Sequence, residues 1–525
     1  MKKYIVIFLA LTIFALVFIE ACGNPFFPGL RNTTGLNGGG TGTSGITIGE
    51  ENETPAAEDE NGTPTFDSFG KVSWVSTLTG AEEGLGDVVA QFCGVAVDQS
   101  GNVYVLGSQN SDSTYSYGAG PAFVVRGKAG LNNFILLKYN ADGNAQWAKA
   151  IMKNSISCVS VNAVTIDQAG NIYIAGYQGG NSIDYGNGVS SIGPRDDYNP
   201  ALVKYDSNGD AKWAYTITDP KNNGKAEFTA LAVDHKGNVY ATGYQTGNGL
   251  YTYGDGVTIN GTSSADNPVL VKIEDKGNEG KAIWAHTVTG GDAVFMTVAV
   301  DATGDVYVAG CQNGLATYTY GDNVTAAGKT SYNNSVLVKY DSGGAAQWAR
   351  TPEAASGASE FYYAAVDEAG NIYLAGSASN IPVLVKYNMS GNVLWTWKPE
   401  KYEPVAGTRG VTFSSIVVDK AGYVYAAGSQ SGLCYYGNGV SVIYINNKKA
   451  SSLLVKYDAG GNARGAWIIN EGTEESGFLD IALDPSSDCL YAVGYQNTDG
   501  DFDYGNDVVV NGIGDENPTL VKFDK

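Results

Sequence analysis

The stretch Val97-Asp98-Gln99-Ser100-Gly101-Asn102-Val103-Tyr104-Val105-Leu106-Gly107 decides the fold, because close variants of it recur along the chain. Each copy places a short apolar run before an Asp-centred turn and a Tyr-containing run after it. The marker aspartates of the copies are Asp98, Asp167, Asp234, Asp301, Asp367, Asp419 and Asp484. A repeat of this kind is one supersecondary unit that buries its core only against neighbouring copies. We therefore interpret the chain as one large repeat domain rather than the several domains that its length alone would suggest.

Each copy contains four runs rich in β-branched and aromatic residues, separated by Gly, Asp and Asn, which is typical of short strands. In the first copy the runs are 92–98, 102–109, 134–140 and 145–151. Tight Asp/Asn-Gly turns join the first run to the second and the third to the fourth. The pattern predicts a four-stranded antiparallel meander, in which the marker aspartates form the turn by accepting backbone hydrogen bonds.

The fourth strand of a copy is marked by a tryptophan, and one copy lacks it. The tryptophans that follow a third strand are Trp147, Trp213, Trp284, Trp348, Trp395 and Trp467. The chain ends with the seventh third strand, whereas residues 70–77, with Trp74, carry the missing pattern. We expect this N-terminal strand to complete the last copy, which leaves only short, protected edges. The predicted fold is all-β: a seven-bladed β-propeller of four-stranded antiparallel blades, closed by its N-terminal strand.

The repeat resembles that of the seven-bladed β-propeller family of bacterial envelope and secreted proteins. The resemblance rests on the Val-Asp-x-x-Gly-Asn-x-Tyr-x-Ala-Gly core and covers residues 70–525. It is specific for architecture and implies a binding or interaction role by analogy alone, since one fold hosts many functions.

The N-terminus predicts export and lipid attachment. Residues 1–22 combine Lys2-Lys3, an apolar run and a small residue before Cys22, like a bacterial lipoprotein signal in which the cysteine is lipidated. Glu20 departs from that pattern, and the alternative is a transmembrane anchor, for which the apolar run is short. Residues 23–69, rich in Gly, Thr and Glu, predict a flexible tether. We expect a lipid-anchored protein of the bacterial envelope, at the outer membrane, facing either the periplasm or the cell surface.

Charge and cysteine content restrict the partners. The chain has 54 acidic and 32 basic residues, a net charge of −22, which disfavours nucleic acids and anionic lipid surfaces. With Cys22 set aside, the five remaining cysteines are an odd number without paired spacing, and we expect buried free thiols. We expect a monomer that binds a protein or glycan.

Six copies carry an additional Tyr-Gly hairpin between the second and third strands, and the fifth copy lacks it. The hairpin tyrosines proposed as a candidate binding face are Tyr117, Tyr185, Tyr253, Tyr320, Tyr436 and Tyr504. Tyrosine offers a flat apolar ring and a hydroxyl that suit glycan or peptide recognition. The alternative is that these rings pack onto the blade beneath. A glutamine after the second strand occurs in the same six copies, and we expect it to hydrogen-bond the hairpin backbone. These residues are Gln109, Gln178, Gln245, Gln312, Gln430 and Gln496.

The sequence offers few residues for catalysis. It has two histidines in different repeat positions and no motif typical of a metal site, a phosphate-binding loop or a serine nucleophile. We predict no catalytic residue, cofactor or metal ligand, and interpret the lysine repeated in every third strand as a possible charge pair. A carbohydrate-active lyase or hydrolase using two carboxylates on the long-loop face remains the alternative. The asymmetry beside the fifth copy, with its loop 398–409, is the first place to look.

Overall fold

The computed structural model describes residues 70–82, 89–110, 114–118, 120, 123–127, 133–151, 159–180, 182–195, 198–220, 224–254, 256–352, 357–444, 449–469, 474–497 and 500–525. These residues belong to one compact unit, Ser68–Lys525. The predicted signal 1–22, its Cys22 and the tether 23–69 lie outside the described residues. In the described residues no helix is long and apolar enough to cross a membrane.

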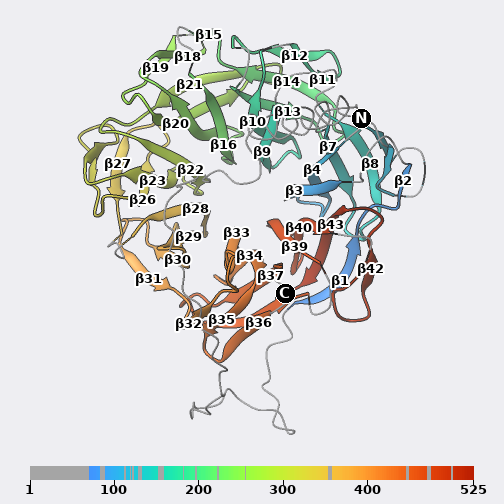
Figure 1. Cartoon of the computed structure of the whole chain (residues 1–525). Helices are drawn as coiled ribbons and strands as arrows, with labels where there is room; N and C mark the ends of the chain where they lie inside the picture. The colour runs from blue at the N-terminus through green and yellow to red at the C-terminus, as the bar shows by residue number, and fades with distance from the viewer. Residues whose placement is uncertain are drawn as a thin grey trace, which may run out of the picture. The chain divides into compact units, whose positions relative to one another are not determined.

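The predicted all-β fold of four-stranded antiparallel sheets is confirmed. Within the described residues there are seven such sheets, whose strands lie around a central region in Figure 1. The first strands are β3 (Ala90–Val97), β9 (Val159–Ile166), β16 (Ala226–Val233), β22 (Ala293–Val300), β28 (Ser359–Val366), β33 (Val411–Val418) and β39 (Ser476–Leu483). The second strands are β4 (Val103–Gln109), β10 (Ile172–Gln178), β17 (Val239–Thr246), β23 (Val306–Asn313), β29 (Ile372–Ala378), β34 (Val424–Gln430) and β40 (Cys489–Asn497).

The third and fourth strands complete the sheets toward the outside. The third strands are β7 (Asn133–Tyr139), β13 (Asn199–Tyr205), β20 (Asp266–Asp275), β26 (Asn333–Tyr340), β30 (Ile381–Tyr387), β37 (Ser451–Tyr457) and β43 (Glu516–Asp524). The outer strands are β8 (Ala145–Ala150), β14 (Ala211–Thr216), β21 (Gly280–His286), β27 (Ala346–Arg350), β31 (Val393–Trp397), β38 (Ala463–Ile468) and β1 (Lys71–Ser76). We number the sheets one to seven in this order. In the seventh sheet β1 pairs antiparallel with β43, with Lys71 opposite Asp524 and Ser76 opposite Leu520.

The marker aspartates hold the turns between the first and second strands. In the first sheet the Asp98 carboxylate accepts hydrogen bonds from the backbone N–H groups of Ser100 and Asn102, both at 2.9 Å. Its other oxygen accepts from the Asn102 side chain at 2.8 Å and the Tyr104 hydroxyl at 3.1 Å. Asp367 makes the corresponding four contacts in the fifth sheet. One carboxylate thus satisfies the turn backbone and fixes the following tyrosine, which is the turn-forming role that the sequence predicts.

A β-bulge in the first strand, which the sequence analysis did not predict, accounts for the glycine that ends each motif. In the third sheet the register shifts between Phe228 and Ala230 opposite Gly243. A Cβ atom on Gly243 would lie 2.0 Å from the Glu227 carbonyl oxygen. The bulge brings this carbonyl so close that no side chain fits at the glycine.

Within the described part of the chain six additional hairpins are present, as predicted, and they leave the sheet between the second and third strands. They are β5 (Thr114–Ser116) with β6 (Val124–Arg126), β11 (Ser182–Gly186) with β12 (Val189–Ile192), β18 (Leu250–Gly254) with β19 (Val257–Asn260), β24 (Thr317–Thr319) with β25 (Thr325–Ala327), β35 (Gly432–Gly437) with β36 (Val440–Tyr444), and β41 (Asp501–Asp503) with β42 (Val509–Asn511). Three of them gain a strand from the segment that leaves the preceding sheet: β2 (Gly80–Glu82), β15 (Asp219–Pro220) and β32 (Lys401–Glu403).

Neighbouring sheets interlock through a tryptophan of one and a turn glycine of the next. The Trp213 ring lies where a Cβ atom on Gly280 would be, within 2.7 Å. The sheet-to-sheet pairs are Trp74–Gly143, Trp147–Gly209, Trp213–Gly280, Trp284–Gly344, Trp348–Gly391, Trp395–Gly461 and Trp467–Gly70. Large and small side chains also interdigitate, since Gly94 faces the Val164 side chain of the second sheet. Buried clusters of Val, Leu, Ile and Tyr fill the space between sheets.

Candidate functional site

The six hairpin tyrosines proposed as a binding face are buried. Their side chains are at most 2 % exposed. Each hydroxyl donates a hydrogen bond to the glutamine at the end of the second strand, for example Tyr117 to Gln109 at 2.8 Å and Tyr253 to Gln245 at 2.9 Å. The prediction that these rings contact a ligand is therefore corrected. Alternation along the hairpin strand directs them inward, where they extend the apolar core and their hydroxyls are satisfied.

Three of the six glutamines also hold the hairpin through their Nε2 atom, whereas that atom has no partner among the described residues in Gln178, Gln245 and Gln496. The Nε2 atom of Gln109 donates to the Val125 carbonyl at 3.1 Å, and Gln430 donates to the Val442 carbonyl at 2.8 Å. Gln312 makes the same bond to Ala326 at 3.3 Å. The predicted bond to the hairpin backbone is confirmed at these three glutamines. The sequence did not predict that the hairpin tyrosine hydroxyl is a second partner of the glutamine, although the fifth copy lacks both the tyrosine and the glutamine.

The repeated lysines stack on the tyrosines that the marker aspartates fix. Lys386 lies 4.7 Å from the centre of the Tyr373 ring, and Lys138 lies 5.0 Å from that of Tyr104. The predicted charge pair exists for Lys339, whose Nζ is 2.7 Å from an Asp305 oxygen. Cation–π contact with a tyrosine ring is thus the role that recurs among these lysines. The repeat in the sequence did not reveal it, because the repeat does not show which side chains lie together.

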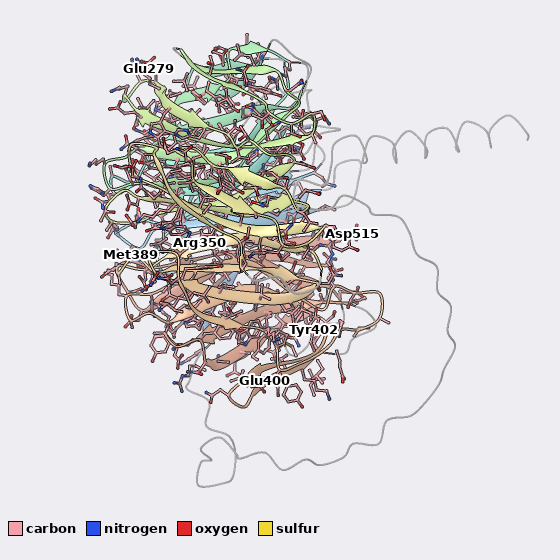
Figure 2. All side chains as sticks on the ribbon, turned by 90° about the vertical axis from the view of Figure 1, so that its left-hand side faces the viewer. Glu279, Arg350, Met389, Glu400, Tyr402 and Asp515 are labelled. Atoms are coloured by element: carbon pink, nitrogen blue, oxygen red, sulfur yellow. The ribbon has the colours of Figure 1, made fainter. Side chains whose placement is uncertain are left out.

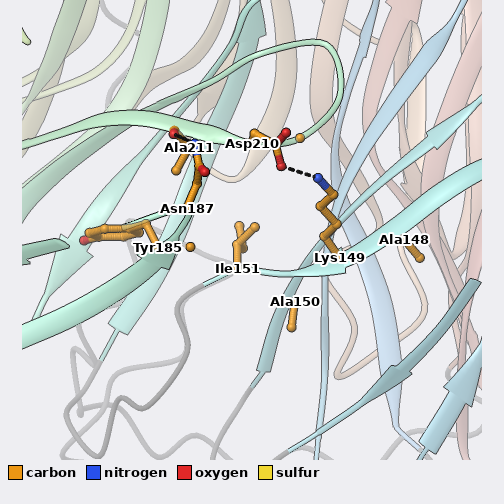
Figure 3. A pocket seen from close by; sticks show the side chains of 10 residues that line it. Ala148, Lys149, Ala150, Ile151, Tyr185, Asn187, Asp210 and Ala211 are labelled. Carbon is orange, nitrogen blue, oxygen red and sulfur yellow. Dashed lines mark hydrogen bonds and ion pairs between the residues drawn. The ribbon is translucent and has the colours of Figure 1, made fainter. Parts of the chain in front are cut away.

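Among the described residues, two solvent-accessible grooves between neighbouring sheets are lined by equivalent structural elements. Each is bounded by the outer strand of one sheet and by the hairpin and the outer turn of the next. The first, of about 330 Å³, lies between β8 and the second sheet and is lined by Lys149, Ile151, Tyr185, Asn187 and Asp210 (Figure 3). Of the six predicted tyrosines, Tyr185 is the one that lines either of the two grooves, and its hydroxyl points to Gln178.

Polar groups of opposite charge face the first groove. Lys149 Nζ lies 2.7 Å from Asp210 Oδ1, and the two side chains are 34 % and 48 % exposed. The Asn187 amide donates to the Ala211 carbonyl at 3.0 Å and keeps its residue in a left-handed conformation at the hairpin tip. An exposed ion pair adds at most about 1 kcal/mol of stability, so both groups can exchange this contact for a ligand.

The second groove, of about 520 Å³, repeats this arrangement between β14 and the third sheet. Its lining includes Trp213, Thr216, Gly254, Glu279 and Lys281. Both grooves can thus offer cationic, anionic and amide groups beside apolar side chains, a combination suited to hydroxyl-rich or peptide ligands.

Two acidic residues, Glu475 and Glu516, lie on either side of Asn497 at the end of the seventh sheet from which its hairpin leaves. Glu475 precedes β39, and Glu516 begins β43 opposite Asn497. Burial, followed by the Glu475 charge, raises the pKa of Glu516 to about 7. The Tyr495 hydroxyl donates to Glu475 at 3.3 Å. The sequence repeat did not single out these acids, because most copies have no acid at the two equivalent positions, although the third has Asp266 and the fourth Asp292.

A different unrepeated acid, Asp480, lies on the first strand of the seventh sheet. Its carboxylate accepts from the Val95 N–H at 3.0 Å, the Ser415 hydroxyl at 2.7 Å and the Ile481 N–H at 2.9 Å. Burial raises the pKa of Asp480 to about 6, although these hydrogen bonds act to lower it. Asp480 therefore links three sheets, since Val95 belongs to the first and Ser415 to the sixth.

Metal ligation and disulfide pairing give no additional site in the part of the chain that is described. No group of three or more His, Cys, Asp or Glu residues is placed there to hold a metal ion. Cys93, Cys311, Cys434 and Cys489 are free thiols as predicted; Cys311 and Cys434 are buried, whereas Cys93 and Cys489 are half-buried, contrary to the expectation. Cys158 lies outside the described residues.

Comparison with known proteins gives distant similarities. No family model matches the chain. It is 23 % identical over 505 residues to an uncharacterized WD repeat-containing protein, L264, of Acanthamoeba polyphaga mimivirus. The match covers 86 % of this chain but 32 % of the relative, so the chain spans about a third of that protein.

The solved structures that match the chain are distant as well. Virginiamycin B lyase from Staphylococcus aureus matches with a TM-score of 0.38 at 10 % identity, covering 82 % of this chain and 94 % of the lyase. YCF48 bound to D1 peptide matches with a TM-score of 0.40 at 12 % identity, covering 87 % of this chain and 97 % of YCF48. These similarities assign no activity. The repeated four-stranded sheets identify a protein of the β-propeller type.

Proposed function

We propose that residues 70–525 form a closed seven-bladed propeller that acts as a non-enzymatic binding or scaffold module. Closure is supported by the pairing of β1 with β43 and by the tryptophan–glycine contacts. Trp467 of the sixth sheet contacts Gly70, and Trp74 of β1 contacts Gly143 of the first sheet. The N-terminal strand thus contacts the sheet on each side through the same tryptophan–glycine pairs as the other outer strands. A ring joined in this way holds its loops on a rigid frame, which favours recognition by preformed surfaces.

The observation that carries the binding role is the pair of grooves of one design on neighbouring sheets. Recurrent concave sites on a repeat scaffold suit an extended or multivalent ligand, either a protein or an envelope glycan. The net charge of −22 makes a nucleic acid an unfavourable partner. The ring is proposed to act as a monomer, which light scattering after gel filtration tests.

The binding role can be tested in cells with a photo-reactive amino acid in place of Asn187, in the first groove. The same group in place of Arg464, an exposed residue paired with Asp458 within the sixth sheet, is the matched control. We expect adducts with a defined protein or glycan from position 187 and not from position 464. Equal labelling from both positions would contradict a ligand in the groove.

The location is proposed from the N-terminal sequence. Cys22 carries the lipid, residues 23–69 form the tether, and the propeller lies at the bacterial outer membrane. Metabolic labelling with a palmitate analogue should mark the wild-type chain and leave Cys22→Ser unmarked. Protease treatment of intact and lysed cells then distinguishes a surface-facing propeller from a periplasmic one.

A second candidate, a carbohydrate-active hydrolase or lyase, is favoured by the Glu475–Glu516 pair. A carboxyl group with a raised pKa beside a second carboxylate suits general acid–base chemistry. Release of reducing ends from envelope polysaccharide, lost in both Glu475→Gln and Glu516→Gln, would support this candidate. Release that persists in both variants would exclude this pair as its origin.

A further inference from the structure

Among the described sheets, the fifth, whose outer strand is β31, is the one without an additional hairpin. The strand order β28-β29-β30-β31 leaves β31 with one neighbour. In the first, second, third, fourth and sixth sheets a hairpin strand packs beside the outer strand, namely β6 with β8, β12 with β14, β19 with β21, β25 with β27, and β36 with β38. The fifth sheet has no such hairpin, because β29 continues into β30 through Ser379 and Asn380. No hairpin of the fifth sheet therefore packs beside β31.

The sequence of β31 also lacks the charge that the other outer strands carry. Those six strands contain Lys71, Lys149, Lys212, Lys281, Arg350 and Arg464. β31 reads Val393-Leu394-Trp395-Thr396-Trp397, without a charged residue. Charged side chains, lysine above all, prevent edge strands from pairing with another chain. The one outer strand without a hairpin is thus also the one without this protection.

Apolar side chains are exposed along this edge. Val393 is 49 % and Leu394 50 % exposed, and Met389 in the preceding turn is 49 % exposed. Leu394 directly precedes the strand tryptophan, where the second sheet has Lys212 and the first has Gln146. A strand added beside β31 would cover these side chains and the free backbone groups together.

The charges near β31 indicate which kind of strand can be added. Residues 369–399 contain no Asp or Glu in a chain with 54 acidic residues. Arg350 lies against the turn that precedes β31, where its Nε donates to the Gly391 carbonyl at 3.2 Å, and it is labelled near Met389 in Figure 2. Lys398 follows the strand and is exposed. A cation therefore lies at each end of β31, and Glu400 is the first acidic residue beyond Lys398.

We propose that β31 binds an extended, acidic peptide segment of a partner protein, which pairs with it as a fifth strand. Backbone hydrogen bonds to β31 supply affinity, whereas Val393 and Leu394 contact apolar side chains of the segment. Arg350 and Lys398 attract acidic residues at its two ends. This inference rests on the proposed binding role and names the kind of partner, but it uses a surface separate from the grooves.

The test measures binding of a fluorescent peptide, Glu-Val-Thr-Val-Thr-Val-Glu, to the full chain by anisotropy. The same peptide with Lys in place of Glu is the charge control. Leu394→Lys places on β31 the residue that the second sheet has naturally, and Thr396→Lys is an independent variant of an exposed residue. Ile283→Lys is the matched control, since Ile283 directly precedes Trp284 on β21 and is 42 % exposed.

We expect the acidic peptide to bind the wild type and Ile283→Lys equally. Binding should weaken about tenfold or more in Leu394→Lys and Thr396→Lys, at an unchanged melting temperature. Equal binding of the Lys peptide, equal binding by all variants, or no binding to the wild type would overturn the proposal. Since no groove residue is altered, failure here and failure of the photo-labelling at Asn187 are distinguishable.

Two other occupants of this edge give different results. Self-association of the wild type in sedimentation, abolished by Leu394→Lys, would mean that a second copy fills the edge. Peptide binding that emerges only after the acidic residues in 50–60 are replaced by Gln would mean that the chain's own N-terminal segment fills it. Either result overturns a partner peptide as the occupant.

Discussion

The indole of Trp74 in β1 lies against Gly143, in the turn between β7 and β8 of the first sheet. A Cβ atom on Gly143 would lie 2.8 Å from the ring, and the indole N–H donates to the Ala141 carbonyl at 3.3 Å. The same contact joins Trp348 of the fourth sheet to Gly391 of the fifth. The N-terminal strand therefore meets the first sheet in the way that an internal sheet meets its neighbour.

This relationship predicts that Trp74→Ala destabilises the ring as much as Trp348→Ala does. Each change removes a large half-buried ring from a sheet-to-sheet contact, at a cost of about 2–4 kcal/mol. Urea unfolding of both variants measures the two losses. A loss for Trp348→Ala together with none for Trp74→Ala would show that β1 is not part of the ring's framework.

The hydrogen bonds of the marker aspartates predict that replacing one of these residues lowers the stability of the protein. Asp367→Ala removes the acceptor of two backbone N–H groups, the Asn371 side chain and the Tyr373 hydroxyl. We expect a loss of about 1–3 kcal/mol, because the partly buried donors lose their partner. Asp367→Asn, which keeps an acceptor oxygen, should lose less. Equal stability of all three proteins in thermal unfolding would contradict the turn-forming role.

The buried hairpin tyrosines predict an effect on stability without one on binding. Tyr117→Phe keeps the ring in the core but leaves Gln109 Oε1 without the hydroxyl donor at 2.8 Å. We expect a loss of about 1–2 kcal/mol in the free energy of unfolding. Photo-labelling from position 187 in this background should be unchanged. Unchanged stability with abolished labelling would instead restore Tyr117 to the binding surface.

Asp480 predicts a pH dependence of stability. Its pKa rises from 3.8 to about 6 in the folded chain, so its favourable contribution is complete below the unfolded value and is lost as pH rises through 6. Burial also raises the pKa of the neighbouring Cys93 to about 12, so that thiol stays neutral throughout.

Asp480→Asn removes the carboxylate that must ionise and keeps an acceptor for the Val95 N–H. The variant should gain stability relative to the wild type between about pH 4 and pH 8, by on the order of 2 kcal/mol. Melting temperatures of both proteins across this range measure the gain. A difference that does not vary with pH would refute the assignment to Asp480.

The repeat predicted the sheets well because its signals are local. Asp98 and Gly101 specify a turn through their own backbone contacts, and alternation in the first strand specifies its two faces. The bulge opposite Gly243 was missed, since a bulge is visible only when two strands are compared in register. The hairpins were found from Tyr-Gly, yet the direction of their rings was not, because alternation alone does not say which face is inside.

The candidate sites depend on contacts between copies, which a single repeat does not encode. Lys149 and Asp210 come from different sheets, as do Asp480 and Ser415. Glu475 and Glu516 lie in one sheet, at positions where most copies have no acidic residue. The exposed edge at Leu394 was partly visible in the sequence, as the missing hairpin of the fifth copy, although its uncharged strand became meaningful only beside the other outer strands.

The central claim, that the N-terminal strand closes a seven-bladed ring, is tested most directly by a disulfide between Lys71→Cys and Asp524→Cys. These residues are opposite one another on β1 and β43, and the neighbouring Cys489 is replaced by Ser to prevent competition. We predict that mild oxidation gives an intramolecular crosslink in the folded monomer, absent from each single variant, and raises the melting temperature. A monomer that stays uncrosslinked, or links only to other molecules, would contradict closure by β1.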